Sequence, residues 1–184
     1  MRLSAEAIAV RKAGAIASQR SRRVTLKDGK SCAMRIEGPE RYQLTFTPEV
    51  FTVLCAKGTN KFYGLATSDL PKLYIASIDS KPIYVGITKQ GIRDRLWRGW
   101  NAKGASGYYG YAWRHGQSPV VLDVWCHMDA VERNERDIET VEAEVVHLIR
   151  AAGQWPAFQT EIHFYPSSPR HRKVAADIMS HYRL

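Results

Sequence analysis

Two tyrosines and a group of cationic side chains lie within the stretch from Leu73 to Arg95. Tyr74 and Tyr84 are ten positions apart, and Lys89 and Arg95 follow the second tyrosine. A phenol has a reference pKa of about 10, so it serves as a base only where nearby cations stabilise the phenolate. An arginine binds phosphate oxygens through a forked pair of hydrogen bonds. The stretch therefore combines groups that can take a proton with groups that bind an anion.

The elements expected to position these side chains are a hairpin and a helix. Residues 73–78 and 83–86 are β-rich runs, and the turn residues 79–82 join them. The two tyrosines fall on opposite arms, where the register can bring both rings to one face. A helical pattern rich in arginine follows, from Ile92 to about Lys103. Cross-strand packing is the other interpretation of the tyrosine pair, because aromatic residues are common in strands.

The hairpin resembles the first part of the GIY-YIG nuclease domain, a family named for two short strand motifs. Leu73-Tyr74 stands where the family has Ile-Tyr, and Tyr84-Val85-Gly86 stands where it has Tyr-Ile-Gly, at the family's usual spacing. Lys89 falls near the downstream lysine of the motif. Lys72 occupies the position of the glycine in the first motif, which is a departure from the family pattern.

The same resemblance implies an arginine on the helix that follows. Arg95, with Leu96 after it, matches the family's helix arginine one residue later than usual, and Arg93 is the alternative. Many members carry a histidine or a third tyrosine shortly after this arginine. Here the aromatic and basic cluster Tyr108–His115 contains residues suited to that role. Packing against the sheet is the favoured interpretation of its rings, and stacking on bases is the alternative.

Acidic residues are supplied by the longest helical pattern in the chain. Its apolar residues recur at spacings of three, four and seven, at Val131, Ile138, Val141, Val145, Leu148 and Ala152. The resemblance selects Glu144 as the metal ligand, with Leu148 four positions on and Gln159 beyond the helix, where the family usually has asparagine. Glu142 is the alternative. Both glutamates flank the apolar stripe, on opposite edges, so periodicity does not choose between them.

The resemblance implies a metal-dependent endonuclease that hydrolyses phosphodiester bonds in duplex or branched DNA. Glu144 would hold one Mg²⁺ or Mn²⁺, with water and phosphate oxygens completing the coordination. Arg95 would bind a nonbridging phosphate oxygen, and Tyr74, or as second choice Tyr84, would orient or deprotonate the attacking water beside Lys89. The further nucleic-acid contacts that we expect are Arg93, Arg98, His115 and Gln159.

Composition favours an anionic partner. The 184 residues carry 27 Lys and Arg against 18 Asp and Glu, a formal charge of +9, with a pI near 9.6. Nucleic acid is the commonest partner of such a chain. Three scattered cysteines form neither a disulfide framework nor a CxxC zinc site, and no run is as apolar and long as a membrane helix. We therefore expect a cytoplasmic protein that does not bind membranes.

The chain divides, by pattern, into three regions. Residues 1–70 are expected to form a basic accessory region, with a helix from Ser4 to about Arg20, strand-like residues from Cys32 to Phe46 and a short helix from Thr47 to Leu54. Residues 71–166 form the nuclease-like domain and residues 167–184 a basic helical tail. With a third strand at 119–125, we expect an α+β fold with a small three-stranded, mainly antiparallel sheet flanked by helices.

Two other functions are compatible with the same residues. A non-catalytic nucleic-acid-binding module on a decayed nuclease fold would tolerate the departures at Lys72 and Gln159. A small structural or ribosome-associated basic protein would share the charge alone.

Overall fold

The computed structural model describes residues 34–128, 135–159 and 162–183. Its strands are β1 (Ile36–Phe46), β2 (Phe51–Cys55), β3 (Lys72–Ile78), β4 (Lys81–Thr88) and β5 (Val120–His127). Its α-helices are α1 (Ile92–Trp100), α2 (Glu135–Ala151) and α3 (Pro169–Met179). Short 3-10 turns span Gly64–Thr67, Ala105–Gly107 and Ala112–His115. The predicted α+β class is confirmed for the part of the chain described.

All five strands form one antiparallel sheet in the order β2-β1-β5-β3-β4. The prediction of three strands was therefore wrong in number. β3, β4 and β5 form the expected core, but β1 pairs along β5 and brings β2 with it. Sequence patterns do not show such long-range pairing. The sheet consequently runs across the boundary expected near residue 70.

The predicted helix from Thr47 to Leu54 is instead a turn followed by β2. Pro48 lies in a tight turn, closed by a hydrogen bond from the backbone N–H of Thr47 to the carbonyl of Val50 (2.9 Å). After it, Val53 and Cys55 are buried while Leu54 is exposed. This alternation, in a segment with aromatic and β-branched residues, is typical of a half-buried strand.

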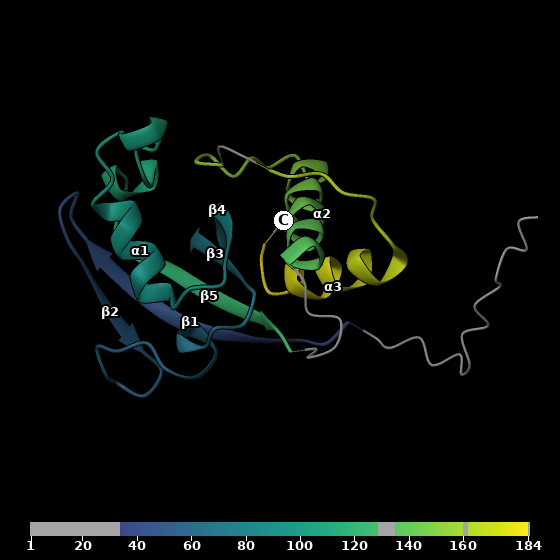
Figure 1. Cartoon of the computed structure of the whole chain (residues 1–184), viewed down its shortest axis with the longest axis horizontal. Coiled ribbons are helices and arrows are strands. Elements are labelled where there is room, and N and C mark those ends of the chain that lie inside the picture. The colour runs from purple at the N-terminus through teal and green to yellow at the C-terminus, as the bar shows by residue number, and fades with distance from the viewer. Residues whose placement is uncertain (1–33, 129–134, 160–161, 184) are drawn as a thin grey trace, which may run out of the picture. The chain divides into compact units, whose positions relative to one another are not determined.

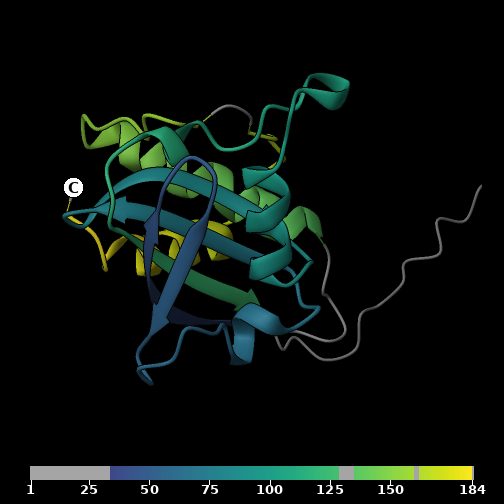
Figure 2. The ribbon, with the colours of Figure 1, turned by 90° about the vertical axis from the view of Figure 1, so that its left-hand side faces the viewer.

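Two hydrophobic layers cover the two faces of the sheet. On one face, α1 contributes Ile92, Leu96 and Trp100 to a core that includes both Tyr74 and Trp113. On the other face, α2 and α3 pack over β3 and β5, around residues such as Ile75 and Trp125. Figure 1 shows the strands between α1 on one side and α2 with α3 on the other, and Figure 2 shows the same layers after a quarter turn.

Lys72, the first residue of β3, is fully buried. Its ammonium group donates hydrogen bonds to the carbonyls of Ser68 (2.6 Å), Leu70 (2.7 Å) and Lys89 (3.3 Å). Burial lowers the pKa of Lys72, and the three carbonyl oxygens replace the water that the cation loses. Lys72 thus connects the segment before β3 to the segment after β4. It stands where the motif that the hairpin resembles has a glycine, and here its role is structural.

A second buried charge joins the C-terminal segment to the sheet. Asp123, in the middle of β5, is fully buried and accepts two hydrogen bonds from the guanidinium of Arg41 (2.7 and 2.8 Å). The hydroxyl of Tyr182, just after α3, donates to the same carboxylate (2.9 Å). Burial, and then the charge of Asp123, raises the pKa of Tyr182, so this phenol stays protonated.

Two predicted segments fall outside the described residues. These are the helix from Ser4 to about Arg20 and the first residues of the long helical pattern, 131–134. Within the described part of the chain, no helix is both long and apolar enough to cross a membrane.

We expect Asp123→Asn to lower the free energy of unfolding by about 2–3 kcal/mol. The amide leaves the Arg41 cation without its carboxylate and replaces a charge-assisted hydrogen bond from Tyr182 with a neutral one. Urea unfolding followed by circular dichroism measures the change. Asp177→Asn is the matched control, because the Lys173–Asp177 pair on α3 is exposed and should contribute no more than about 0.5 kcal/mol. Equal effects of the two variants would contradict the proposed anchoring.

Candidate active site

The hairpin register places four residues of β3 and β4 on one face. Tyr74 lies opposite Gly86, and Ala76 lies opposite Tyr84, so the two tyrosines are diagonal neighbours with ring centroids 6.0 Å apart. A Cβ on Gly86 would lie 2.7 Å from ring atoms of both tyrosines. Glycine at this position therefore allows the two rings to approach each other.

The two tyrosines differ in their access to solvent. Tyr74 is fully buried, and its hydroxyl oxygen lies 2.8 Å from that of Tyr111, in hydrogen-bond contact. Tyr84 lines an open pocket of about 270 Å³ at the outer edge of β4. Tyr84, rather than Tyr74, is therefore the phenol that a substrate or a water molecule can reach. The sequence favoured Tyr74 as the first candidate and Tyr84 as the second, whereas the difference in access to solvent favours Tyr84.

The pKa values of all three tyrosines are raised. Burial is the largest cause for Tyr74, Tyr84 and Tyr111, and Arg95 acts in the opposite direction on each of them. For Tyr84, the neighbouring Tyr74 and the carboxylate of Glu142 raise the pKa further. At neutral pH these side chains are neutral phenols, which hold their neighbours by hydrogen bonds rather than by charge.

Arg95 is the arginine that α1 directs to this pocket. It lines the pocket beside Tyr84, and its guanidinium lies 5.6 Å from the ring centroid of Tyr111 and donates to the hydroxyl of Tyr108 (3.2 Å). Arg93 is exposed, and donates instead to the carbonyl of Asn60 (3.4 Å). The contacts thus distinguish two arginines that the sequence pattern left as alternatives.

Two carboxylates of α2 close the opposite side of the pocket. Glu139 and Glu142 both line it, as expected for residues three apart on one helix face. Glu142 is only 5% exposed, so its charge lies within the protein wall of the pocket. Glu144, the residue selected by family resemblance, is half-buried and is not among the lining residues. The structure therefore brings the alternative, Glu142, together with Tyr84 and Arg95.

The remaining predicted residues lie around this pocket or away from it. Lys89 forms an ion pair with Glu135 (2.7 Å) in which both side chains are about half exposed. Arg98 lines a neighbouring hollow on α1, and His115 is exposed and accepts a hydrogen bond from Arg114 (3.1 Å). None of the three lines the pocket that holds Tyr84.

Gln159 has a structural contact with the sheet. Its side-chain oxygen accepts a hydrogen bond from the backbone N–H of Val85 (3.0 Å), and the N–H of Phe158 donates to the carbonyl of Ile83 (3.0 Å). Both contacts satisfy outward-facing backbone groups of the edge strand β4. Gln159 therefore holds the strand that carries Tyr84.

Sequence reasoning missed Glu139 and His163, which also line the pocket. Glu139 was detectable as the residue one turn before Glu142, but several other glutamates on the same helix obscured it. No local signal marks His163, because it lies beyond α2 in a segment without regular structure. Tyr108 and Tyr111 were expected only as members of an aromatic cluster, and the structure places both beside Arg95.

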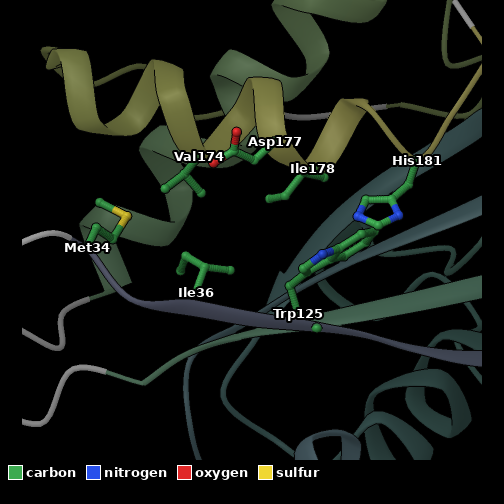
Figure 3. Close-up of a pocket in the computed structure, with 8 residues that line it drawn as sticks. Met34, Ile36, Trp125, Val174, Asp177, Ile178 and His181 are labelled. Carbon is green, nitrogen blue, oxygen red and sulfur yellow. The ribbon is translucent and has the colours of Figure 1, made fainter.

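A separate hollow of about 160 Å³ lies on the other face of the sheet, between α3 and Trp125 of β5 (Figure 3). Most of its lining residues are apolar, with Ile36 and Ile178 on opposite sides, and its polar side chains are Asp177 and His181. Among the described residues that line it there is no lysine or arginine. Its chemistry does not suit a phosphate group.

Comparison of the chain with protein-family models, with curated proteins and with solved structures yields no significant match.

Proposed function

We propose that this protein is a metal-dependent endonuclease that hydrolyses phosphodiester bonds in DNA. One observation carries the proposal: β4, α1 and α2 bring Tyr84, Arg95 and Glu142 to a single pocket. A phenol, a guanidinium and a carboxylate are the three functional groups that the sequence resemblance calls for. They meet although α1 and α2 cover opposite faces of the sheet.

Arg95 is the group suited to bind the scissile phosphate. Its guanidinium is partly buried among the aromatic rings of Tyr108 and Tyr111, which fixes its direction while leaving it at the pocket wall. In such a partly desolvated position, the attraction between a cation and a phosphate oxygen is stronger than in bulk water. Arg95 therefore holds a nonbridging oxygen and stabilises the negative charge that develops there.

Tyr84 is the group suited to position the attacking water. Tyr84 lines the pocket, and its phenol is neutral at pH 7, because the ordinary pKa of a phenol is already about 10 and burial raises it further. A neutral phenol both donates and accepts hydrogen bonds, so it can hold a water molecule with a lone pair directed at the phosphorus. Tyr74 supports this arrangement from behind, through its ring contact with Tyr84 and its hydrogen-bond contact with Tyr111.

The acidic side of the pocket fits a hard divalent cation. Among the described residues, no group of three or more His, Cys, Asp or Glu side chains is arranged to hold a metal ion. Magnesium, however, is usually held by one or two carboxylates, with waters and substrate phosphate oxygens completing its octahedron. Glu142, with Glu139 one turn away, supplies that donor set. When bound, Mg²⁺ or Mn²⁺ neutralises phosphate charge and lowers the pKa of water.

The first prediction tests the choice of carboxylate. Glu142→Gln should reduce Mg²⁺-dependent nicking of supercoiled plasmid by about 10²-fold or more, because the amide has nearly the same shape but lacks the charge that a hard cation requires. Glu144→Gln, two residues away on the same helix, is the matched control and should retain near-normal activity. Loss of activity in Glu144→Gln alone would move the metal site back to Glu144. Full activity in both variants would exclude a mechanism that depends on either glutamate.

The second prediction separates the two hairpin tyrosines. Tyr84→Phe should lower the nicking rate by roughly 10²-fold, because the attacking water loses the hydroxyl group that positions it. Tyr74→Phe removes a buried hydroxyl and should mainly cost about 1 kcal/mol of stability, with a smaller loss of rate. Tyr109→Phe, an exposed tyrosine outside the pocket, serves as the control. Wild-type rates in Tyr84→Phe would show that this tyrosine only packs.

The third prediction concerns DNA binding without catalysis. In EDTA, the affinity for duplex DNA should fall steeply with salt, because each phosphate contact adds a slope of roughly 0.9 in log K against log salt. Arg98→Ala, on α1 in the hollow next to this pocket, should reduce the slope by about one. Arg172→Ala, on α3 in the opposite layer, should leave it unchanged. Fluorescence anisotropy of a labelled duplex measures both, and a salt-independent affinity would contradict DNA binding through phosphates.

A further inference from the structure

A second, larger hollow adjoins the pocket that holds Tyr84. Its volume is about 610 Å³, and it lies between α1 and the segment that ends at Tyr108. Arg95 and Tyr108 line both hollows, so the two share a wall. A ligand that places a phosphate at Arg95 therefore extends into this second hollow or passes beside it.

The walls of this hollow combine aromatic rings with cations. Trp97 is 58% exposed and Tyr108 is 41% exposed, so both rings are accessible to a ligand at the wall of this hollow. The charged lining residues described are Arg95, Arg98 and Lys103, and there is no carboxylate among them. The pocket that holds Tyr84 differs in this respect, because the carboxylates of Glu139 and Glu142 line it. The second hollow thus suits a flat, apolar group that is attached to an anion.

The loop that carries Tyr108 is held in a fixed shape. The N–H of Gly104 donates to the carbonyl of Tyr108 (3.0 Å), and the N–H of Tyr108 donates to the carbonyl of Ala105 (3.1 Å). Ser106, within this loop, has a φ of 53°, in the left-handed region that non-glycine residues rarely adopt. Such strain is retained where the surrounding structure fixes it, and it often occurs at ligand sites.

We infer that the hollow lined by Trp97 and Tyr108 takes one unpaired nucleobase of the DNA strand whose phosphate Arg95 binds. Pockets of roughly 300–1,000 Å³ hold compact organic ligands, so there is room for a base with its sugar. Bases stack on exposed aromatic side chains, and arginine and lysine hold the adjoining phosphates. The inference rests on the proposed function for the position of the DNA, and it specifies the substrate class as duplex DNA with a locally unpaired base.

Base pairing explains why the substrate should be locally unpaired. Within a duplex, each base is stacked on its neighbours and exposes only its edges, so its face cannot contact Trp97. Moving a base out of the stack costs free energy, and the cost is least for a base that has no partner. A bulged nucleotide next to the scissile phosphate therefore fills the hollow at the lowest cost.

Binding to three otherwise identical duplexes tests the inference. One is fully paired, one has a single bulged adenosine, and one has a bulged abasic nucleotide that keeps the backbone shape without the base. The full-length chain is titrated in EDTA, so that no cleavage occurs, and affinity is measured by fluorescence anisotropy. We expect the adenosine bulge to bind at least about fivefold more tightly than the abasic bulge.

Variants then locate the effect. Trp97→Ala should bring the ratio of the two affinities close to one, and Trp97→Phe should retain part of the preference. Trp155→Ala is the matched control, because Trp155 is similarly exposed at 62% and lines neither hollow. Circular dichroism confirms that each variant is folded. An unchanged ratio in Trp97→Ala would overturn the assignment of this hollow.

The outcomes separate the inference from the proposed function. Equal affinity of the wild-type chain for the two bulges would overturn the base-binding hollow, even if plasmid nicking is observed. A clear preference for the adenosine bulge without any metal-dependent nicking would overturn hydrolysis and retain base recognition. Absence of binding to every duplex at low salt would overturn both.

Discussion

The close approach of aromatic rings around two glycines is the constraint on which the candidate site depends. A Cβ on Gly86 of β4 would collide with Tyr74 and Tyr84, and a Cβ on Gly99 of α1 would lie 2.0 Å from the ring of Tyr111. Glycine at both positions lets the sheet and α1 pack closely enough for the tyrosines to touch. The ring positions are thus set by the backbone spacing of two elements. Such placement is more rigid than contacts between long side chains.

The charged groups of the pocket come from helices on opposite faces of the sheet, and this determines where the pocket lies. The cation of the pocket comes from α1, and its carboxylates come from α2 on the opposite face of the sheet. The pocket lies at β4, the outermost strand of the sheet, where residues of both layers line it. Away from this edge, the sheet lies between α1, which carries Arg95, and α2, which carries Glu142. Arg95 and Glu142 therefore line one pocket from two different layers.

Local patterns predicted the parts of the fold that depend on neighbouring residues. The hairpin, α1, α2 and β5 follow from turn residues and from periods of two or 3.6, and the structure has all four. Pairing of β1 with β5 depends on residues far apart in the chain, and no local pattern encodes it. The choice between Glu142 and Glu144 likewise depends on how α2 rotates against β4. The fully buried positions of Lys72 and Asp123 could not be predicted either, because charged residues usually stay exposed.

The backbone contacts made by Phe158 and Gln159 affect more than the position of one strand. An uncovered edge strand offers a row of free N–H and C=O groups on which another chain can add a strand, leading to dimers or aggregates. In this protein, the carbonyl of Ile83 and the N–H of Val85 are already engaged, on either side of Tyr84 in the sequence. These contacts hinder the addition of a strand at this part of the edge, while Tyr84 still lines the pocket.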